Sequence, residues 1–388
     1  MVNELIGASS MLHGDGWLGP GWVQLADDRI VAAGRTAPPR NPDRVLDSGV
    51  LAPGFIDLQF NGAGGLDFAD ARRSVWDQLL REVLTTGVTS VVPTLVTAPL
   101  PDLLACLRFA STFPQQVTSG QARALGVHLE GPFLAPVWRG AHNEPDLLGP
   151  TSVAVDELLQ VGAGALRMVT LAPELPGGFE SIARLTEAGV VVAIGHTGAS
   201  DEQARHAIDL GARLVTHLYN AQTGLHHREP GVVGQVLTDS RVVASLIVDL
   251  IHVAAPAVRL AFASKPGKIA LITDSVPAAG LPVGRHQMAD GEVVVSPDGV
   301  PRRLDGTLAG SALTMDQAIR NAVAIGIRLA DALAAATHVP ADVLGRADVG
   351  RIAPGAHADL VWLDDELIPG ALWLGGRATD INALLRTF

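Results

Sequence analysis

The stretch "LRMVTLAPELPGGFESIARLTEAGVVVAIGHTG", residues 166–198, decides the fold. Two short and continuous apolar runs, 166–174 and 190–198, lie on either side of the helical pattern GFESIARLTEAG. Runs of this kind are typical of strands that are buried on both faces, as in a parallel sheet. The stretch therefore predicts a strand–helix–strand unit of an α/β fold.

The same alternation extends over most of the chain. Six more apolar runs, with helical patterns such as DEQARHAIDLGA between them, occur at 54–60, 88–95, 123–131, 212–220, 242–249 and 268–275. Together with the first two runs they make eight candidate strands. Strand–helix alternation over this length predicts a TIM-like (β/α)8 barrel spanning residues 52–350.

The two ends of the chain have a different pattern. Residues 1–51 and 351–388 contain short β segments separated by Gly, Pro and Asp turns, for example WVQLADDRIVAAG and PGAHADLVWLD. Neither end has enough apolar surface to fold alone. We therefore expect both ends to pair into one small β-sandwich domain.

Composition and charge exclude several classes of protein. A hydrophobic content of 48% with 18% charged residues is typical of a globular chain with a large core. The net charge of −12 argues against nucleic acid or an anionic membrane as partner. Cys106 is the only cysteine, which excludes an intrachain disulfide and a cysteine-based zinc cluster. The first residues resemble no export signal, and the apolar stretch 242–263 is interrupted by charge, so we expect a soluble, cytoplasmic protein.

Chemically capable side chains end five of the candidate strands: Glu130, His196, His217, Asp249 and Asp274. Taken singly, each has an ordinary explanation, such as a packing histidine or an aspartate that caps a helix. The carboxyl ends of barrel strands, however, converge on one mouth. Charged and imidazole groups gathered there are costly unless they bind something.

One carboxylate and two imidazoles, from Glu130, His196 and His217, suit a single zinc- or iron-like ion with positions left open for water. Such an ion lowers the pKa of bound water. Asp274, which ends the last strand, is our candidate to take the proton of that water and pass it to a leaving amine. The chain has only two lysines, both in the turn-like segment SKPGK, so a two-metal site bridged by a carbamylated lysine is excluded.

Several segments, in order along essentially the whole chain, resemble the N-acetylglucosamine-6-phosphate deacetylase family of the amidohydrolase superfamily. They are PGFIDLQFNGAGG, HLEGPF followed by GAHN, IGHTGAS, THLYNAQ, HHREPGVVG, IVDLIHV, LITDSVPAAG and GTLAGSALTM. The resemblance implies hydrolysis of N-acetyl-D-glucosamine 6-phosphate to D-glucosamine 6-phosphate and acetate, in amino-sugar catabolism and cell-wall recycling.

The resemblance also implies roles for individual residues. Glu130, His196 and His217 would hold one divalent metal ion per subunit, zinc first, with iron, cobalt or manganese as alternatives. Asp274 would be the acid/base, and His142 would polarise the acetamide carbonyl, although a histidine in a loop could equally be a solvated turn residue. The implied substrate contacts are Ala141, His142, Asn220, Ala221, Arg228, His252, Leu308, Ala309 and Gly310.

The phosphate contacts carry a further implication. The resemblance gives Arg228 and His252 to the phosphate, with Arg228 reaching in from a neighbouring subunit, which predicts a homodimer or homotetramer. An arginine offers a fork of donors to phosphate oxygens, although a surface ion pair with Glu229 would also explain it. His226 and His227 have no assigned place.

The first strand departs from the wider superfamily. Where superfamily relatives place a His-x-His pair for a second metal ion, this chain has Gln59 and Asn61. Neutral amides bind transition metals weakly, so both are predicted to act by hydrogen bonding beside a mononuclear site.

Other functions stay open at this stage. The same reaction on N-acetylgalactosamine 6-phosphate or another N-acylated sugar differs only in pocket contacts. A cyclic amidase or nucleobase deaminase is disfavoured because the first strand lacks His-x-His. An inactive sugar-phosphate sensor is disfavoured because Glu130, His196, His217 and Asp274 are all present.

Overall fold

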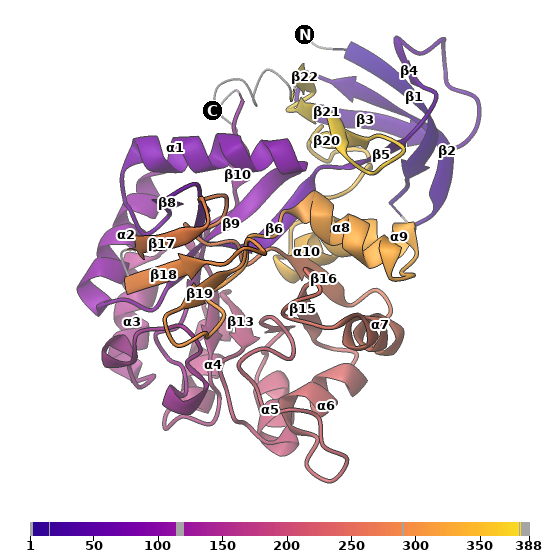
Figure 1. Cartoon of the computed structure of the whole chain (residues 1–388). Helices are drawn as coiled ribbons and strands as arrows, with labels where there is room; N and C mark the ends of the chain where they lie inside the picture. Colours follow the sequence, from indigo (N-terminus) through magenta and orange to yellow (C-terminus); the bar gives the residue numbers. More distant parts are fainter. Residues whose placement is uncertain (1–2, 15, 114–119, 289–290, 380, 382–388) are drawn as a thin grey trace.

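The computed structural model describes residues 3–14, 16–113, 120–288, 291–379 and 381 (Figure 1). Within that part of the chain, eight parallel strands form a barrel, as predicted. They are β6 (Phe55–Phe60), β9 (Val88–Val96), β11 (Val127–Glu130), β12 (Leu166–Leu171), β13 (Val191–Ile194), β14 (Leu214–Val215), β15 (Val243–Ile247) and β16 (Ile269–Ile272). The two-residue strand β10 (Arg123–Ala124) pairs with the start of β9.

The barrel closes between its first and last strands. The backbone N–H of Asp274 donates to the carbonyl of Gln59 at 2.9 Å, and that of Asn61 donates to the carbonyl of Ser275 at 2.8 Å. These bonds lie just beyond the carboxyl end of β16. The closure therefore brings Gln59 and Asn61, at the end of β6, next to Asp274, which follows β16.

Helices cover the outside of the barrel. They are α1 (Arg73–Glu82), α2 (Leu100–Thr112), α3 (Ser152–Val161), α4 (Gly178–Glu187), α5 (Asp201–Asp209), α6 (Gly231–Thr238), α7 (Ala255–Ser264), α8 (Met315–Ala324), α9 (Leu329–Ala336) and α10 (His338–Val343). In α4 the buried Ile182 and Leu185 lie one turn apart and face the barrel core. A capping box starts α5, with Ser200 and Gln203 each bonding the other's backbone N–H.

Both ends of the chain contribute to one further sheet beside the barrel (Figure 1). Its strands are β1 (Asn3–Leu12), β2 (Leu18–Ala26), β3 (Arg29–Gly34), β4 (Arg44–Leu46), β5 (Val50–Pro53), β20 (Leu360–Leu363), β21 (Pro369–Leu374) and β22 (Arg377–Thr379). The order is β22-β21-β20-β5-β1-β2-β3, with β4 also paired to β1. β5 pairs with β20, which joins the amino-terminal strands to the carboxyl-terminal ones.

This terminal sheet has a hydrophobic core of its own, which includes Met11, Leu25, Leu360 and Trp373. A bridge between Arg29 and His357 links β3 to the segment before β20, so the sheet curls around that core. The sheet continues to the end of β5 at Pro53, two residues past the expected boundary at 51.

A small antiparallel sheet follows the last barrel strand and was not predicted. It consists of β17 (Gly284–Met288), β18 (Gly291–Val295) and β19 (Pro301–Arg303). The turn between β18 and β19 holds Pro-Asp-Gly at 297–299, and Gly299 has the positive φ of 81° that such a turn requires. Val293 and Val295 bury against Ala278, which follows β16. A second small pair, β7 (Gly62–Ala63) with β8 (Leu66–Asp67), follows β6.

None of the helices among the described residues combines the length and the apolar character needed to span a membrane.

Candidate active site

A cavity of about 410 Å³ opens at the carboxyl ends of the barrel strands. It gathers most of the side chains that the sequence singled out. Those that line it are Asn61, Glu130, Ala141, His142, His196, His217, Asn220, Ala221, His252, Asp274, Leu308, Ala309 and Gly310. Met288 and Val293 of the small antiparallel sheet form part of its wall. The predicted strand ends therefore meet in one place.

Three donor atoms converge at the centre of the cavity. Glu130 Oε1 lies 3.1 Å from His196 Nε2 and 2.9 Å from His217 Nε2, and the two Nε2 atoms are 3.1 Å apart. Ligands held about 2.0–2.1 Å from one ion at tetrahedral angles are about 3.3 Å from one another. The three atoms are close to that spacing, so this donor set fits a divalent metal ion.

The local backbone aims these side chains inward. His196, His217 and Asp274 all have positive φ, at 51°, 31° and 50°. This left-handed region is uncommon for residues with a Cβ, and such residues cluster at functional sites. Each strand thus ends in a turn that points its last polar side chain into the barrel mouth.

The surroundings of the three donors set their charge. Burial alone would raise the pKa of Glu130, but hydrogen bonds from His196 and His217 hold that pKa well below its usual range. Burial opposes the charged form of His217 as well, yet the contact with Glu130 raises the pKa of this imidazole. His196 Nδ1 donates to the carbonyl of Trp138 at 2.8 Å, so a metal ion that displaced the Nε2 proton would meet the Nε2 lone pair.

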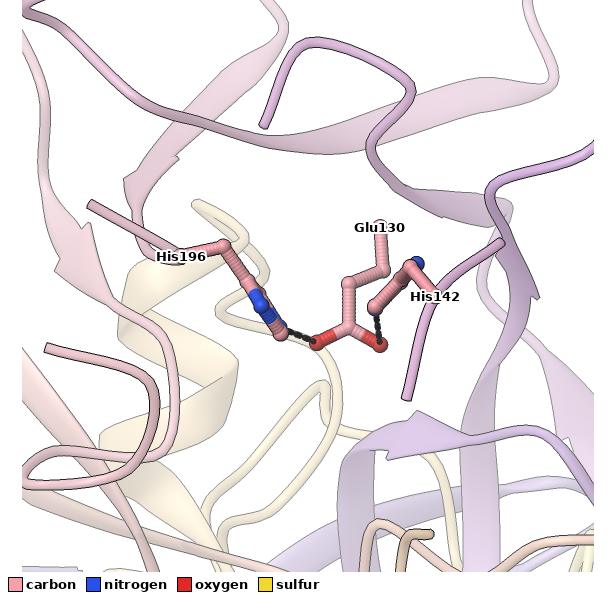
Figure 2. A group of neighbouring side chains, drawn as sticks. All are labelled: Glu130, His142 and His196. Carbon is pink, nitrogen blue, oxygen red and sulfur yellow. Dashed lines mark hydrogen bonds and ion pairs between the residues drawn. The ribbon is translucent and has the colours of Figure 1, made fainter. Parts of the chain in front are cut away.

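His142 lies on the other side of the Glu130 carboxylate. Figure 2 shows the imidazoles of His196 and His142 flanking it, one at each carboxylate oxygen. His196 Nε2 is 3.1 Å from Oε1, and His142 Nε2 is 3.7 Å from Oε2. Donor atoms of Glu130, His142 and His196 all lie within 4.8 Å of one another, so geometry alone also permits a metal-binding trio with His142. Burial and the charge of His196 lower the pKa of His142 to about 3. His142 is therefore neutral at ordinary pH and is not a solvated turn residue.

Asp274 is held by the amides of the first strand. Its Oδ1 accepts hydrogen bonds from Gln59 Nε2 at 3.0 Å and from Asn61 Nδ2 at 3.1 Å. Gln59 Nε2 also donates to Glu130 Oε1 at 3.0 Å. Burial, together with the charge of Glu130, raises the pKa of Asp274 to about 6. Gln59 does not line the cavity but lies below it, linking the carboxylates of Glu130 and Asp274.

Asp57 supports this arrangement from beneath. Its carboxylate is fully buried and accepts hydrogen bonds from the backbone N–H of Gln59 at 3.1 Å and the hydroxyl of Thr273 at 2.5 Å. Burial raises the pKa of Asp57 to about 7. It ties the first strand to the residue before Asp274.

Two predicted phosphate contacts lie in different environments. His252 lines the cavity, and its Nδ1 is 2.6 Å from Asp249 Oδ2. Asp249, unlike the other four strand-end residues, therefore pairs with this histidine and does not reach the cavity. Arg228 lies on an exposed loop outside the cavity, where its Nη1 is 2.8 Å from His227 Nε2. The ring of His227 is 4.3 Å from that of His226. The chain's own cavity thus has no contribution from Arg228.

The sequence analysis missed two contributing residues. The carbonyl of Trp138 orients His196, and Thr97, directly after β9, contacts His142. Trp138 acts through its backbone, which any residue type could supply. Thr97 stands one residue after a strand, and extending the strand-end rule from charged groups to hydroxyls would have found it.

A (β/α)8 barrel with a carboxylate, imidazoles and a buried aspartate at the ends of its strands defines the class of barrel hydrolases that use a divalent metal ion. The sequence model of the Amidohydrolase family matches residues 50–388, and the chain belongs to this family.

Relatives along nearly the whole chain narrow the comparison. The chain is 39% identical to N-acetylgalactosamine-6-phosphate deacetylase of Escherichia coli O157:H7, with 97% of this chain and 99% of that protein covered. It is 40% identical to N-acetylglucosamine-6-phosphate deacetylase of Bos taurus, with 92% of each covered.

Solved structures agree. A mutant N-acetyl-D-glucosamine-6-phosphate deacetylase from Mycobacterium smegmatis, in complex with N-acetyl-D-glucosamine-6-phosphate, superposes with a TM-score of 0.91 at 38% identity, covering 97% of this chain and 99% of that one. The N-acetylglucosamine-6-phosphate deacetylase of Thermotoga maritima gives 0.87 at 31%, covering 96% and 99%. The family resemblance seen in the sequence is confirmed.

Proposed function

We propose that this chain hydrolyses the acetamide of N-acetyl-D-glucosamine 6-phosphate, releasing acetate and D-glucosamine 6-phosphate. The observation that carries the proposal is the convergence of Glu130 Oε1, His196 Nε2 and His217 Nε2, with distances of 2.9–3.1 Å between them, beside the buried Asp274. Relatives that cover nearly the whole chain and are named for this reaction support it.

In this proposal Glu130, His196 and His217 hold one divalent ion, with zinc as the first candidate. When bound, the ion supplies a Lewis acid that activates water and polarises the amide carbonyl. One carboxylate with two imidazoles also accepts iron, cobalt or manganese.

The chain's own residues then move the protons. Asp274, ionised above its pKa of about 6, takes a proton from the attacking water and delivers it to the departing amine nitrogen. His142, which is neutral, donates a hydrogen bond to the acetamide oxygen as negative charge develops there. Gln59 and Asn61 keep the Asp274 carboxylate in place through their bonds to Oδ1.

We propose that the phosphate is bound by His252 from one subunit and Arg228 from its neighbour, in a homodimer or a homotetramer. An anionic substrate needs local positive charge in a chain whose net charge is −12. Arg228 is exposed and lies outside its own cavity, as a residue supplied to another subunit must. Asn220, Ala221 and the backbone of 308–310 complete the sugar-binding wall.

The test of the reaction is acetate release by purified protein. Acetate and primary amine are expected in equal amounts from N-acetylglucosamine 6-phosphate, and kcat/KM is expected to fall sharply for the sugar without phosphate. Absence of acetate from every N-acetylated hexosamine 6-phosphate, with the metal bound, would refute the proposal.

A second candidate substrate is N-acetylgalactosamine 6-phosphate, because the Escherichia coli relative named for it is as similar to this chain as the glucosamine enzymes. Comparing kcat/KM on the two epimers decides between them. A preference for the galacto form would overturn the substrate assignment while leaving the reaction.

The proposal for Arg228 has its own test. Arg228→Ala and Asp274→Asn subunits are coexpressed with different tags, and the mixed oligomer is purified. If Arg228 acts across the interface, the mixed oligomer contains sites with both native residues and regains activity that neither variant has alone. If it acts within its own chain, or not at all, mixing adds nothing.

A further inference from the structure

Two polar atoms of Thr97 contact one nitrogen of His142. It is 4% exposed and directly follows β9. Its backbone N–H donates to His142 Nδ1 at 3.4 Å, and its hydroxyl oxygen lies 2.9 Å from the same nitrogen. Since a backbone N–H can only donate, Nδ1 must offer its lone pair. A neutral imidazole carries one proton, so that proton is on Nε2.

His196 is fixed in the opposite way. A carbonyl oxygen can only accept, so the 2.8 Å contact with Trp138 places a proton of His196 on Nδ1. A bound metal ion would take the place of the Nε2 proton that faces Glu130 Oε1 at 3.1 Å and would meet the Nε2 lone pair. Two neighbouring histidines, with ring centres 4.6 Å apart, therefore face the cavity with different groups. With the ion bound, His196 would present a lone pair, whereas His142 presents an N–H.

From this geometry we infer that Thr97 is a positioning residue that holds His142 in the Nε2–H tautomer and thereby assigns it as a hydrogen-bond donor, not a metal ligand. A metal-binding imidazole must present a lone pair to the ion. The trio with His142 is thus disfavoured, and His217 completes the ligand set. The inference rests on the proposed function only for the acceptor, which is the acetamide oxygen.

The neighbouring backbone makes room for the Thr97 hydroxyl. A Cβ at position 131 would lie 2.2 Å from Thr97 Oγ1, and Gly131 has a positive φ of 88°. The glycine of the segment HLEGPF therefore permits the contact. The hydroxyl also lies 3.4 Å from the carbonyl of Glu130, so Thr97 connects the loop of His142 to the carboxyl end of β11.

The direct test is the tautomer of His142 in zinc-loaded protein labelled with ¹⁵N-histidine. Two-dimensional spectra that correlate ring nitrogens with ring protons distinguish Nε2–H from Nδ1–H, and the His142→Gln spectrum identifies the signals. We expect Nε2–H for His142 and unchanged metal content in His142→Gln. An Nδ1–H pattern in the wild type, or loss of the ion in His142→Gln, would overturn the inference.

Variants of Thr97 test its contribution to turnover. Thr97→Val keeps the backbone donor and the side-chain shape but loses the hydroxyl, so we expect kcat to fall about five- to tenfold, with KM and metal content unchanged. Thr97→Ser keeps a hydroxyl and is expected to restore kcat to within about twofold. Wild-type kcat in folded Thr97→Val, or a loss of metal there, would contradict a positioning role.

The two readouts separate this inference from the proposed function. A protein that releases no acetate but shows the Nε2–H pattern refutes the reaction and leaves the tautomer assignment intact. A protein that releases acetate but shows an Nδ1–H pattern refutes the tautomer assignment and leaves the proposed reaction intact.

Discussion

Replacing Asp274 by Asn tests the proposed acid/base with little change in shape. The Asp274 Oδ1 atom accepts from Gln59 and Asn61 at 3.0 and 3.1 Å, and an asparagine oxygen can accept both bonds. The variant therefore keeps the side chain in place and removes its charge and its capacity to take a proton. Because the pKa of Asp274 is about 6, the wild-type group is mostly ionised at pH 7.5 and available as a base.

The expected loss follows from what a positioned acid/base contributes. Removing it costs about 10²- to 10⁴-fold in kcat, which is about 3–5.5 kcal/mol in the activation free energy. Glu130, His196 and His217 are untouched, so KM and the amount of bound metal are expected to change little. The assay is acetate release at saturating N-acetylglucosamine 6-phosphate, with metal content measured on the same sample.

A matched control comes from Asp156→Asn on α3. Asp156 pairs with Arg184 on the outer surface and does not line the cavity, so its loss is expected to leave kcat unchanged. If Asp274→Asn retains kcat within about threefold of the wild type with its metal bound, Asp274 is not the acid/base.

Three further perturbations probe other parts of the account. Ionised Asp274 is the active form, so log(kcat/KM) should decrease as the pH drops through the pKa of Asp274, which is about 6. A bound cation favours the carboxylate and would move this midpoint to lower pH. Activity that rises from pH 7 to pH 5 would contradict this. Gln59→His combined with Asn61→His should raise the metal content, measured by elemental analysis, above that of the wild type. An unchanged metal content would show that positions 59 and 61 do not determine whether a second metal ion binds. Arg123→Met removes the partner that lies 3.2 Å from the buried Asp359 carboxylate. The free energy of unfolding should fall by about 3–5 kcal/mol, seen as a lower midpoint in thermal denaturation. A midpoint equal to that of the wild type would show that the pair does not stabilise the contact between the barrel and the terminal sheet.

The barrel and the centre of its site could be predicted from the sequence because both depend on one simple pattern. Strands buried on both faces are continuous apolar runs, and parallel strands bring their carboxyl ends together. Glu130, His196, His217 and Asp274 each end such a run, so their meeting follows from the fold.

The supporting contacts could not be predicted in the same way. The positive φ values of His196 and Asp274 belong to residues with a Cβ, and no glycine marks them in the sequence. The bond from His196 to Trp138 uses a backbone carbonyl, which every residue type carries. These features arise only when loops from different strands pack together.

Other differences have identifiable causes. Asp249 was grouped with the strand-end residues, but its short bond to His252 turns it away from the cavity. The sheet of β17, β18 and β19 follows the last barrel strand, outside the strand–helix alternation on which the prediction rested, although its Pro-Asp-Gly turn is a recognisable signal. Arg228 lies outside its own cavity, and its predicted role across an interface stays a prediction.

The most direct test of the central claim is metal stoichiometry measured on protein purified without added metal, together with acetate release by the same sample. One site formed by Glu130, His196 and His217, with amides at positions 59 and 61, predicts about one ion per active chain. It also predicts that activity follows that content when the ion is removed and restored. Two ions per active chain, or full acetate release by metal-free protein, would contradict a mononuclear deacetylase.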